Sequence, residues 1–176
     1  MPEKITLKEV NGLNREEFVT RFGSLYEHSP WVAESASGER PFEDLSEMNA
    51  AFARAVWKAP PERRLALIKG HPDLAGKAAM AGNLTPESTR EQASLGLNQL
   101  SREEFEAFTK LNGAYKAKFG FPMVIAVREH TKDSIMTNAV VRLQNSREEE
   151  VSRALEEITK IARYRLEETV EKGDQK

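Results

Sequence analysis

Apolar residues recur every three or four positions through the last part of this sequence. After Ser146 they keep to one helical face, at Val151, Leu155, Ile158, Ala162, Leu166 and Val170. This spacing follows the 3.6-residue period of an α-helix and departs from the strict alternation of a strand. Ser146 and Glu149 also form the pattern of a capping box, which begins many helices. The pattern predicts one long amphipathic helix with a heavily charged outer face.

The same period predicts helices along most of the preceding chain. The first is capped by Asn14 and carries Phe18, Phe22, Leu25 and Tyr26 on one face, and the second covers 44–58. The third begins at Pro60 and Pro61 and ends at Gly70. The fourth is capped by Ser101 and Glu104 and carries Phe105, Phe108, Leu111 and Tyr115, and the fifth covers 133–143. The small, polar stretch 34–40 is predicted to be a loop. The apolar run 123–127 lacks a partner strand, so we expect an extended or short helical segment. The predicted fold is all-α, in a single domain over 1–176.

Composition excludes several classes of protein. The 176 residues carry a net charge of −2, which argues against a broad surface for nucleic acid. Because there is no cysteine, disulfides, thiolate chemistry, zinc fingers and iron–sulfur clusters are excluded. No run approaches the roughly 18 apolar residues of a membrane span, and the N-terminal sequence lacks a secretory apolar core. We therefore expect a soluble cytoplasmic protein.

His71 is the strongest candidate for proton transfer. It lies between Gly70 and Pro72, where a helix is expected to end, and Asp73 is close enough in sequence to orient it. Histidine suits this chemistry because its pKa lies near neutral pH. His28 and His130 lie in polar surroundings and are interpreted as surface or capping residues. The segment 71–83 has no clear period and is predicted to be a short helix or an ordered loop.

Ser88, Glu91 and Gln92 share one face of a helix, because they are spaced at i, i+3 and i+4. One interpretation is a capping box with a solvated glutamine, which Pro86 in the first turn supports. The other is a ligand site, since a helix N-terminus favours a carboxylate. Arg128 has two interpretations too, as the first exposed residue after a buried run or as a clamp for a carboxylate.

Three ordered blocks of the sequence together resemble one enzyme family. They are His71-Pro72-Asp73-Leu74-Ala75-Gly76, then Leu84-Thr85 with Ser88-Thr89-Arg90-Glu91-Gln92 and Gly96-Leu97, and finally Leu111-Asn112, Tyr115 and Phe119-Gly120-Phe121-Pro122 with the apolar run to Arg128. These blocks resemble the 2-oxo-4-hydroxy-4-carboxy-5-ureidoimidazoline (OHCU) decarboxylases of urate breakdown, which make S-allantoin. Each block alone is weak, and their shared order makes the resemblance specific.

The resemblance implies an all-α, often homodimeric enzyme that needs no metal or organic cofactor. His71 matches the family's catalytic histidine and Glu91 its glutamate partner. The positions that match the family's substrate site are Pro72, Ser88, Gln92, Pro122, Met123, Val124, Ile125, Ala126 and Arg128. Within 122–126 the contacts to substrate are expected from the main chain. Met123 stands where an aromatic residue is more usual. A hydroxyisourate hydrolase is the expected neighbour in the pathway.

Other functions are compatible with parts of the pattern. A non-catalytic helical binding or assembly domain would use the charged last helix as its surface. A metal-assisted hydrolase would use His71 with nearby carboxylates, although no recognisable ligand spacing is present. A carboxymuconolactone-type decarboxylase is a third all-α candidate, but the block order differs and its redox-active relatives use cysteines.

Overall fold

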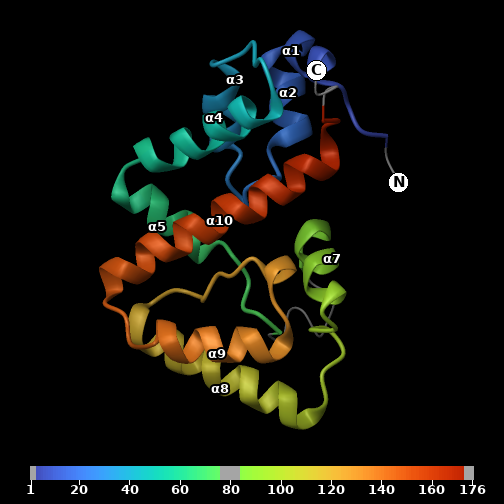
Figure 1. Cartoon of the computed structure of the whole chain (residues 1–176). Helices are drawn as coiled ribbons and strands as arrows, with labels where there is room; N and C mark the ends of the chain where they lie inside the picture. Colours follow the sequence, from blue (N-terminus) through green and yellow to red (C-terminus); the bar gives the residue numbers. More distant parts are fainter. Residues whose placement is uncertain (1–2, 76–83, 173–176) are drawn as a thin grey trace. The chain divides into compact units, whose positions relative to one another are not determined.

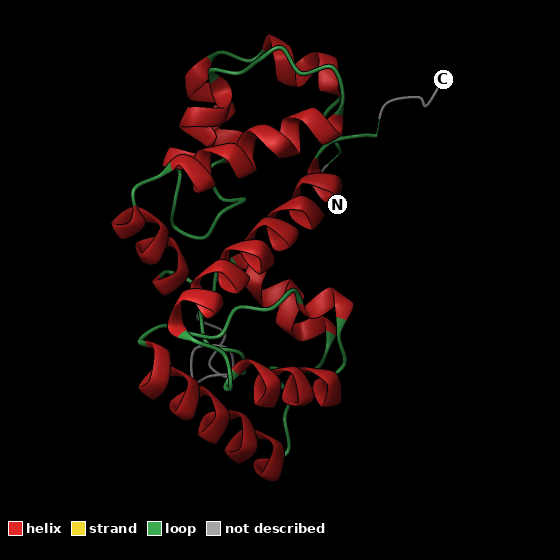
Figure 2. Ribbon diagram, turned by 60° about the vertical axis from the view of Figure 1, so that its left-hand side comes forward, coloured by secondary structure: helices red, strands yellow, loops and turns green. Residues whose placement is uncertain are grey.

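The computed structural model describes residues 3–75 and 84–172, which form two compact units (Figure 1). Unit 1 comprises the chain up to Leu67 together with the chain from Thr159 onward, and unit 2 comprises residues 68–158. The described chain is helical (Figure 2), and its β-type pairing is limited to one isolated bridge between Ile5 and Val170. The predicted all-α fold is confirmed. No helix among the described residues is long and apolar enough to cross a membrane.

Unit 1 contains α1 (Leu7–Gly12), α2 (Arg15–Phe22), α3 (Trp31–Ser37), α4 (Leu45–Lys58), most of α5 (Pro61–Lys69) and the end of α10 (Arg147–Thr169). Helix α3 packs against both α2 and α4. The core of this unit is a cluster of aromatic rings, in which Phe18 lies 5.9 Å from Phe52 and Tyr26 stacks on Phe52 at 6.1 Å between ring centroids.

Unit 2 contains α7 (Pro86–Ser94), α8 (Arg102–Phe119), the 3-10 turn η1 (Val127–Glu129), α9 (Lys132–Arg142) and the first half of α10. Helices α8 and α9 lie side by side, and α7 packs against η1. Tyr115, Phe119 and Phe121 form the aromatic part of its core, with ring centroids 4.6–6.0 Å apart.

The predicted helix starts are largely confirmed, because their caps are local. Asn14, Asp44, Ser101 and Ser146 each accept a hydrogen bond from the main chain three residues on. Proline begins α5, and the segment before η1 is extended as expected. The first predicted helix is shorter than expected. Helix α2 ends at Phe22, although Leu25 and Tyr26 beyond it are still buried.

The prediction of a loop over 34–40 was wrong for 34–37 and confirmed for 38–40. Helix α3 covers Trp31–Ser37, with Pro30 at its N-cap. Its buried residues are Val32, Ala33, Ala36 and Ser37. Small residues look like a loop in sequence because they carry little hydrophobic signal. Here they allow α3 to pack closely against α2 and α4, and this tertiary burial outweighs weak local propensity.

Arg165 of α10 forms a buried ion pair that anchors this helix within unit 1. Its guanidinium donates to Glu27 Oε1 (2.9 Å) and to the Leu25 carbonyl (3.2 Å), and the two charged side chains are 5% and 1% exposed. Arg163 on the same helix pairs with Glu167 at 4.0 Å, but its side chain is 46% exposed. Burial therefore distinguishes two arginines that look alike in sequence.

We expect Arg165→Met to lower the free energy of unfolding by about 3–5 kcal/mol, because the buried Glu27 carboxylate loses the guanidinium that pairs with it. Arg163→Met is the matched control and should change it by no more than about 1 kcal/mol. Urea denaturation of both variants measures the difference. Equal losses would show that burial of the pair does not govern its contribution.

Candidate active site

His71 lies just beyond the end of α5, in unit 2. Its main-chain N–H donates to the Ile68 carbonyl (3.1 Å), and the residue is 8% exposed. Pro72 and Asp73 follow and are half-buried, while Leu74 and Ala75 are buried. The predicted histidine is therefore largely withdrawn from solvent. The rest of the segment predicted as a short helix or loop, 76–83, lies outside the described residues, as does Gly76 of the first block.

The loop 72–75 is held in place by side chains from two helices. The Gln92 side chain of α7 accepts from the Ala75 N–H (2.8 Å) and donates to the Asp73 carbonyl (3.3 Å). From α8, Asn112 donates to the Leu74 carbonyl (2.8 Å), and Lys116 pairs with the Asp73 carboxylate (2.8 Å).

The backbone of this loop has an unusual conformation at Ala75. Ala75 has a φ of 53°, in the left-handed region that a non-glycine residue seldom adopts. The bonds from Gln92 and Asn112 stabilise the loop in this conformation. His71 stands at the start of the same loop, so these bonds fix the main chain that follows it.

Helix α7 presents the second group of predicted residues. Ser88 and Gln92 are 5% and 4% exposed, and Glu91 beside them is half-buried. The interpretation of Ser88 as an N-cap was wrong, because Thr85 caps the helix and accepts from the Ser88 N–H (3.2 Å). Ser88 is thus the third residue of the helix, and its side chain is buried on the same face as Gln92.

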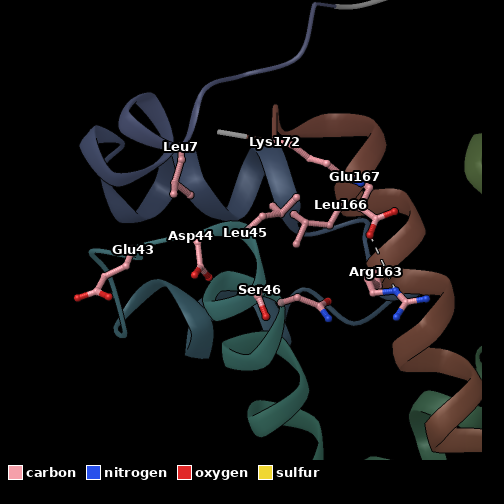
Figure 3. A pocket seen from close by; sticks show the side chains of 10 residues that line it. Leu7, Glu43, Asp44, Leu45, Ser46, Arg163, Leu166, Glu167 and Lys172 are labelled. Carbon is pink, nitrogen blue, oxygen red and sulfur yellow. Dashed lines mark ion pairs between the residues drawn. The ribbon is translucent and has the colours of Figure 1, made fainter. Parts of the chain in front are cut away.

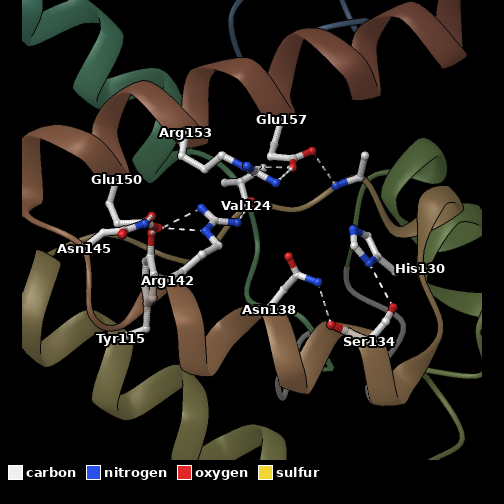
Figure 4. A network of polar contacts seen from close by, with 11 residues as sticks. Tyr115, Val124, His130, Ser134, Asn138, Arg142, Asn145, Glu150, Arg153 and Glu157 are labelled. Carbon is white, nitrogen blue, oxygen red and sulfur yellow. Dashed lines mark hydrogen bonds and ion pairs between the residues drawn. The ribbon is translucent and has the colours of Figure 1, made fainter.

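The third group, Pro122 to Ala126, is buried throughout, and Val127 beside it begins η1. Two of its main-chain groups are fixed by charged side chains (Figure 4). Arg142 of α9 donates to the Val124 carbonyl (2.6 Å), and Glu157 of α10 accepts from the Ala126 N–H (3.3 Å). Arg153 in turn holds Glu157, at 3.0 Å. The segment is therefore shaped by side chains distant in sequence.

Arg142 belongs to a buried polar network. It pairs with Glu150 at 2.8 Å, with the two side chains 3% and 0% exposed. Asn145 and the Tyr115 hydroxyl also donate to Glu150. Burial, and next the hydrogen bond to Glu150, raise the pKa of Tyr115 well above its ordinary value. The phenol consequently stays protonated around neutral pH, as its role as a donor to Glu150 requires.

The three blocks of predicted residues meet around α7. Hydrogen bonds from Gln92 join this helix to the loop that follows His71, and α7 packs against η1, which follows the 122–126 segment. Arg128 lies in η1, and its side chain is exposed. His28, in unit 1, is exposed, and His130, directly after η1, is hydrogen-bonded to Ser134 (2.9 Å).

Sequence analysis missed the polar side chains that shape the site. Asn112 stands four residues after Phe108, on the buried face of α8, so an asparagine in an apolar stripe was the available signal. Glu150 and Glu157 similarly stand on the buried face of α10, which also carries Ala154 and Ile158. A charge placed where the helical period demands an apolar residue indicates a buried polar contact.

Two other features do not coincide with these residues. A pocket of about 620 Å³ in unit 1 is lined by α1, the start of α4 and the end of α10 (Figure 3), and it includes none of the predicted site residues. No cluster of three or more histidine or carboxylate side chains suited to a metal ion occurs within 3–75 and 84–172.

Comparison with known proteins decides the family. The OHCU decarboxylase family model matches residues 11–167. The chain belongs to the OHCU decarboxylase family. It is 43% identical to the 2-oxo-4-hydroxy-4-carboxy-5-ureidoimidazoline decarboxylase of Haloferax volcanii, over 94% of this chain and 96% of that protein. With the Xenopus laevis decarboxylase the identity is 37%, over 91% of both. A uric acid degradation bifunctional protein of Bacillus subtilis, PucL, is 39% identical, but the match covers 34% of its length.

Solved structures agree with this family assignment. A crystal structure of (S)-allantoin synthase matches with a TM-score of 0.76 and 31% identity, over 95% of this chain and 54% of that one. A crystal structure of OHCU decarboxylase in the presence of (S)-allantoin matches with a TM-score of 0.64, over 89% of this chain and 97% of that one. At 19% identity the second match shows a shared fold.

We expect Gln92→Met to loosen the loop after His71, because both hydrogen bonds from the amide are lost while the volume is nearly kept. The free energy of unfolding should fall by about 1–3 kcal/mol, and the Ala75 amide should exchange faster with solvent. Ser94→Ala on the exposed side of α7 is the control, with an expected change within about 0.5 kcal/mol. Hydrogen exchange followed by NMR measures the effect, and an unchanged Ala75 rate would contradict it.

Proposed function

We propose that this protein decarboxylates OHCU to S-allantoin and carbon dioxide, as a step of urate catabolism. The observation that carries the proposal is the convergence of the family's three sequence blocks around α7. Close relatives that are named OHCU decarboxylase and that match along nearly their whole length support it.

The chemistry explains why the proposal needs no cofactor. The substrate carbon that loses carbon dioxide also bears a hydroxyl, and it lies beside a carbon–nitrogen unit that can accept electrons. When the bond to the carboxylate breaks, its electron pair moves into this unit, so the substrate supplies its own electron sink. The ring nitrogen that receives the electron pair takes up a proton. The hydroxyl then loses its proton to become the ring carbonyl, and the neighbouring carbon gains one proton. The protein must position the ring and deliver this proton to one face.

His71 is the proposed general acid/base. It would accept the proton of the substrate hydroxyl and return a proton to the developing carbanion. Its withdrawal from solvent supports this role, because bulk water would protonate both faces of the carbon and give a racemic product. Glu91, on the face of α7 that also carries Ser88 and Gln92, would hold the imidazole or the hydroxyl in register.

The remaining residues would bind the substrate. Ser88 and the 122–126 main chain are proposed to contact its ring carbonyl and ureido groups, and Pro72 to line the site. The Gln92 amide has a remaining N–H beyond its two bonds to the loop, so positioning and substrate contact are compatible. The exposed Arg128 is proposed to attract or hold the substrate carboxylate.

Two broader aspects belong to the same proposal. The resemblance to the family supports a homodimer. It also supports a pathway in which a hydroxyisourate hydrolase supplies the unstable substrate. The match to part of a uric acid degradation bifunctional protein is consistent with such coupling of steps.

The direct test generates OHCU in place, from urate with uricase and hydroxyisourate hydrolase, and then adds this protein. We expect rapid formation of optically active S-allantoin, followed by circular dichroism, with no loss of rate in the presence of a chelator. His71→Ala and His71→Gln should reduce the rate to near the spontaneous value. Because the substrate also decays by itself to racemic allantoin, optical activity is the decisive readout.

Slow racemic product from folded parent protein would overturn the decarboxylase proposal and favour a helical binding module. Loss of activity with chelator would favour a metal-assisted hydrolase instead. Optically active product from His71→Gln at the parental rate would leave the reaction in place but remove His71 from its role.

Glu91→Gln separates a catalytic from a structural role for this carboxylate. We expect kcat to fall at least about tenfold, since the neutral amide orients the imidazole less well and does not stabilise its charged form. The melting temperature should change little, because Thr85 and not Glu91 belongs to the N-cap of α7. Thermal denaturation and steady-state kinetics check this. A large loss of stability with kcat retained would instead assign Glu91 to the fold.

A further inference from the structure

Two charged side chains set the orientation of the peptide groups on either side of Ile125. Arg142 donates to the carbonyl of the preceding residue, Val124, at 2.6 Å, and Glu157 accepts from the N–H of the following residue, Ala126, at 3.3 Å. Figure 4 shows these contacts reaching the segment from α9 and α10. The two side chains are themselves paired, Arg142 with Glu150 and Glu157 with Arg153.

Peptide geometry then dictates where the polar groups of Ile125 point. Both flanking peptide bonds are trans, so the N–H and C=O of each peptide group point in opposite directions. The Ile125 N–H therefore points away from Arg142, and the Ile125 C=O points away from Glu157. Neither group takes part in a hydrogen bond with another residue within 3–75 and 84–172, although Ile125 is only 2% exposed.

Buried main-chain groups are nearly always hydrogen-bonded in native proteins. A neighbouring donor and acceptor on one residue match a cyclic urea or amide, which offers a carbonyl beside an N–H. The OHCU ring has this arrangement. We propose that Glu157 is a positioning residue, which fixes the peptide group after Ile125 so that the main chain of Ile125 binds the ring of the substrate. This inference rests on the proposed function and extends it to a residue on α10.

The contacts of Glu157 favour this role over simple helix pairing. Its side chain is 1% exposed, whereas that of its partner Arg153 is 40% exposed. An ion pair between residues four apart on a helix does not require burial of the carboxylate. The buried oxygen is instead used on Ala126 N–H, in a segment 31 residues away in sequence.

Three variants separate the effect of the hydrogen bond between Glu157 and the Ala126 N–H from the effect of the Glu157 charge. Glu157→Leu removes the acceptor. Glu157→Gln keeps an oxygen acceptor for Ala126 N–H but abolishes the ion pair. Glu167→Leu is the matched control, because it removes an arginine–glutamate pair of the same spacing on the same helix. For each folded variant, KM and kcat would be measured in the coupled assay with in-place substrate, and the Kd of S-allantoin by calorimetry.

We expect Glu157→Leu to raise KM and the Kd of S-allantoin about tenfold, the factor that corresponds to loss of one well-placed hydrogen bond, with kcat nearly unchanged. Glu157→Gln should restore both to within about threefold of the parent, and Glu167→Leu should match the parent. A merely structural role would lower the melting temperature of Glu157→Leu without moving KM or Kd, and that result would overturn the inference.

The outcomes also separate this inference from the function on which it rests. If Glu157→Leu does not fold, Glu157→Asp takes its place, because the shorter side chain keeps the charge but withdraws the acceptor from the Ala126 N–H. KM and Kd raised about tenfold, with kcat nearly unchanged, would support the inference, and parental KM and Kd would overturn it. If the parent protein makes only racemic allantoin, both the proposed function and the positioning role of Glu157 are overturned. If the parent makes S-allantoin and Glu157→Leu keeps parental KM and Kd, the positioning role alone fails.

Discussion

The buried ion pair between Arg142 and Glu150 is the interaction on which unit 2 most depends. It joins α9 to α10. Glu150 also accepts a hydrogen bond from Tyr115 of α8, and Arg142 donates one to the Val124 carbonyl. A pair that is 3% and 0% exposed pays a large desolvation cost, which only a full set of hydrogen bonds offsets. Such a network tolerates little displacement of its members. The candidate substrate segment is consequently held by the most constrained part of the unit.

The arrangement separates two tasks. Titratable groups suited to proton transfer, His71 and Glu91, stand on the loop after α5 and on α7. The proposed recognition groups are main-chain atoms of an apolar segment, which carry no charge of their own. Polar side chains behind them, such as Gln92 and Glu157, hold the backbone in place. Preorganisation of this kind suits a reaction in which the substrate provides its own electron sink and the protein supplies orientation.

Sequence reasoning succeeded where structure is local and failed where it is not. The capping box at Ser101 and the proline start of α5 depend on neighbouring residues alone, and both were predictable. Helix α3 was missed because its small residues become helical only through packing against α2 and α4. Ser88 was interpreted as a possible cap because Ser-x-x-Glu is the pattern of a capping box, but Thr85 is the N-cap of α7.

By itself, the sequence determined the helical fold, the family and the candidate residues for proton transfer, because periodicity, caps and ordered blocks are all patterns of consecutive residues. Only the tertiary structure decided how these residues are held. Asn112, Arg142 and Glu157 act on segments 18–38 residues away. No local pattern encodes such contacts, since a buried polar side chain is stabilised only by the partner that folding brings to it.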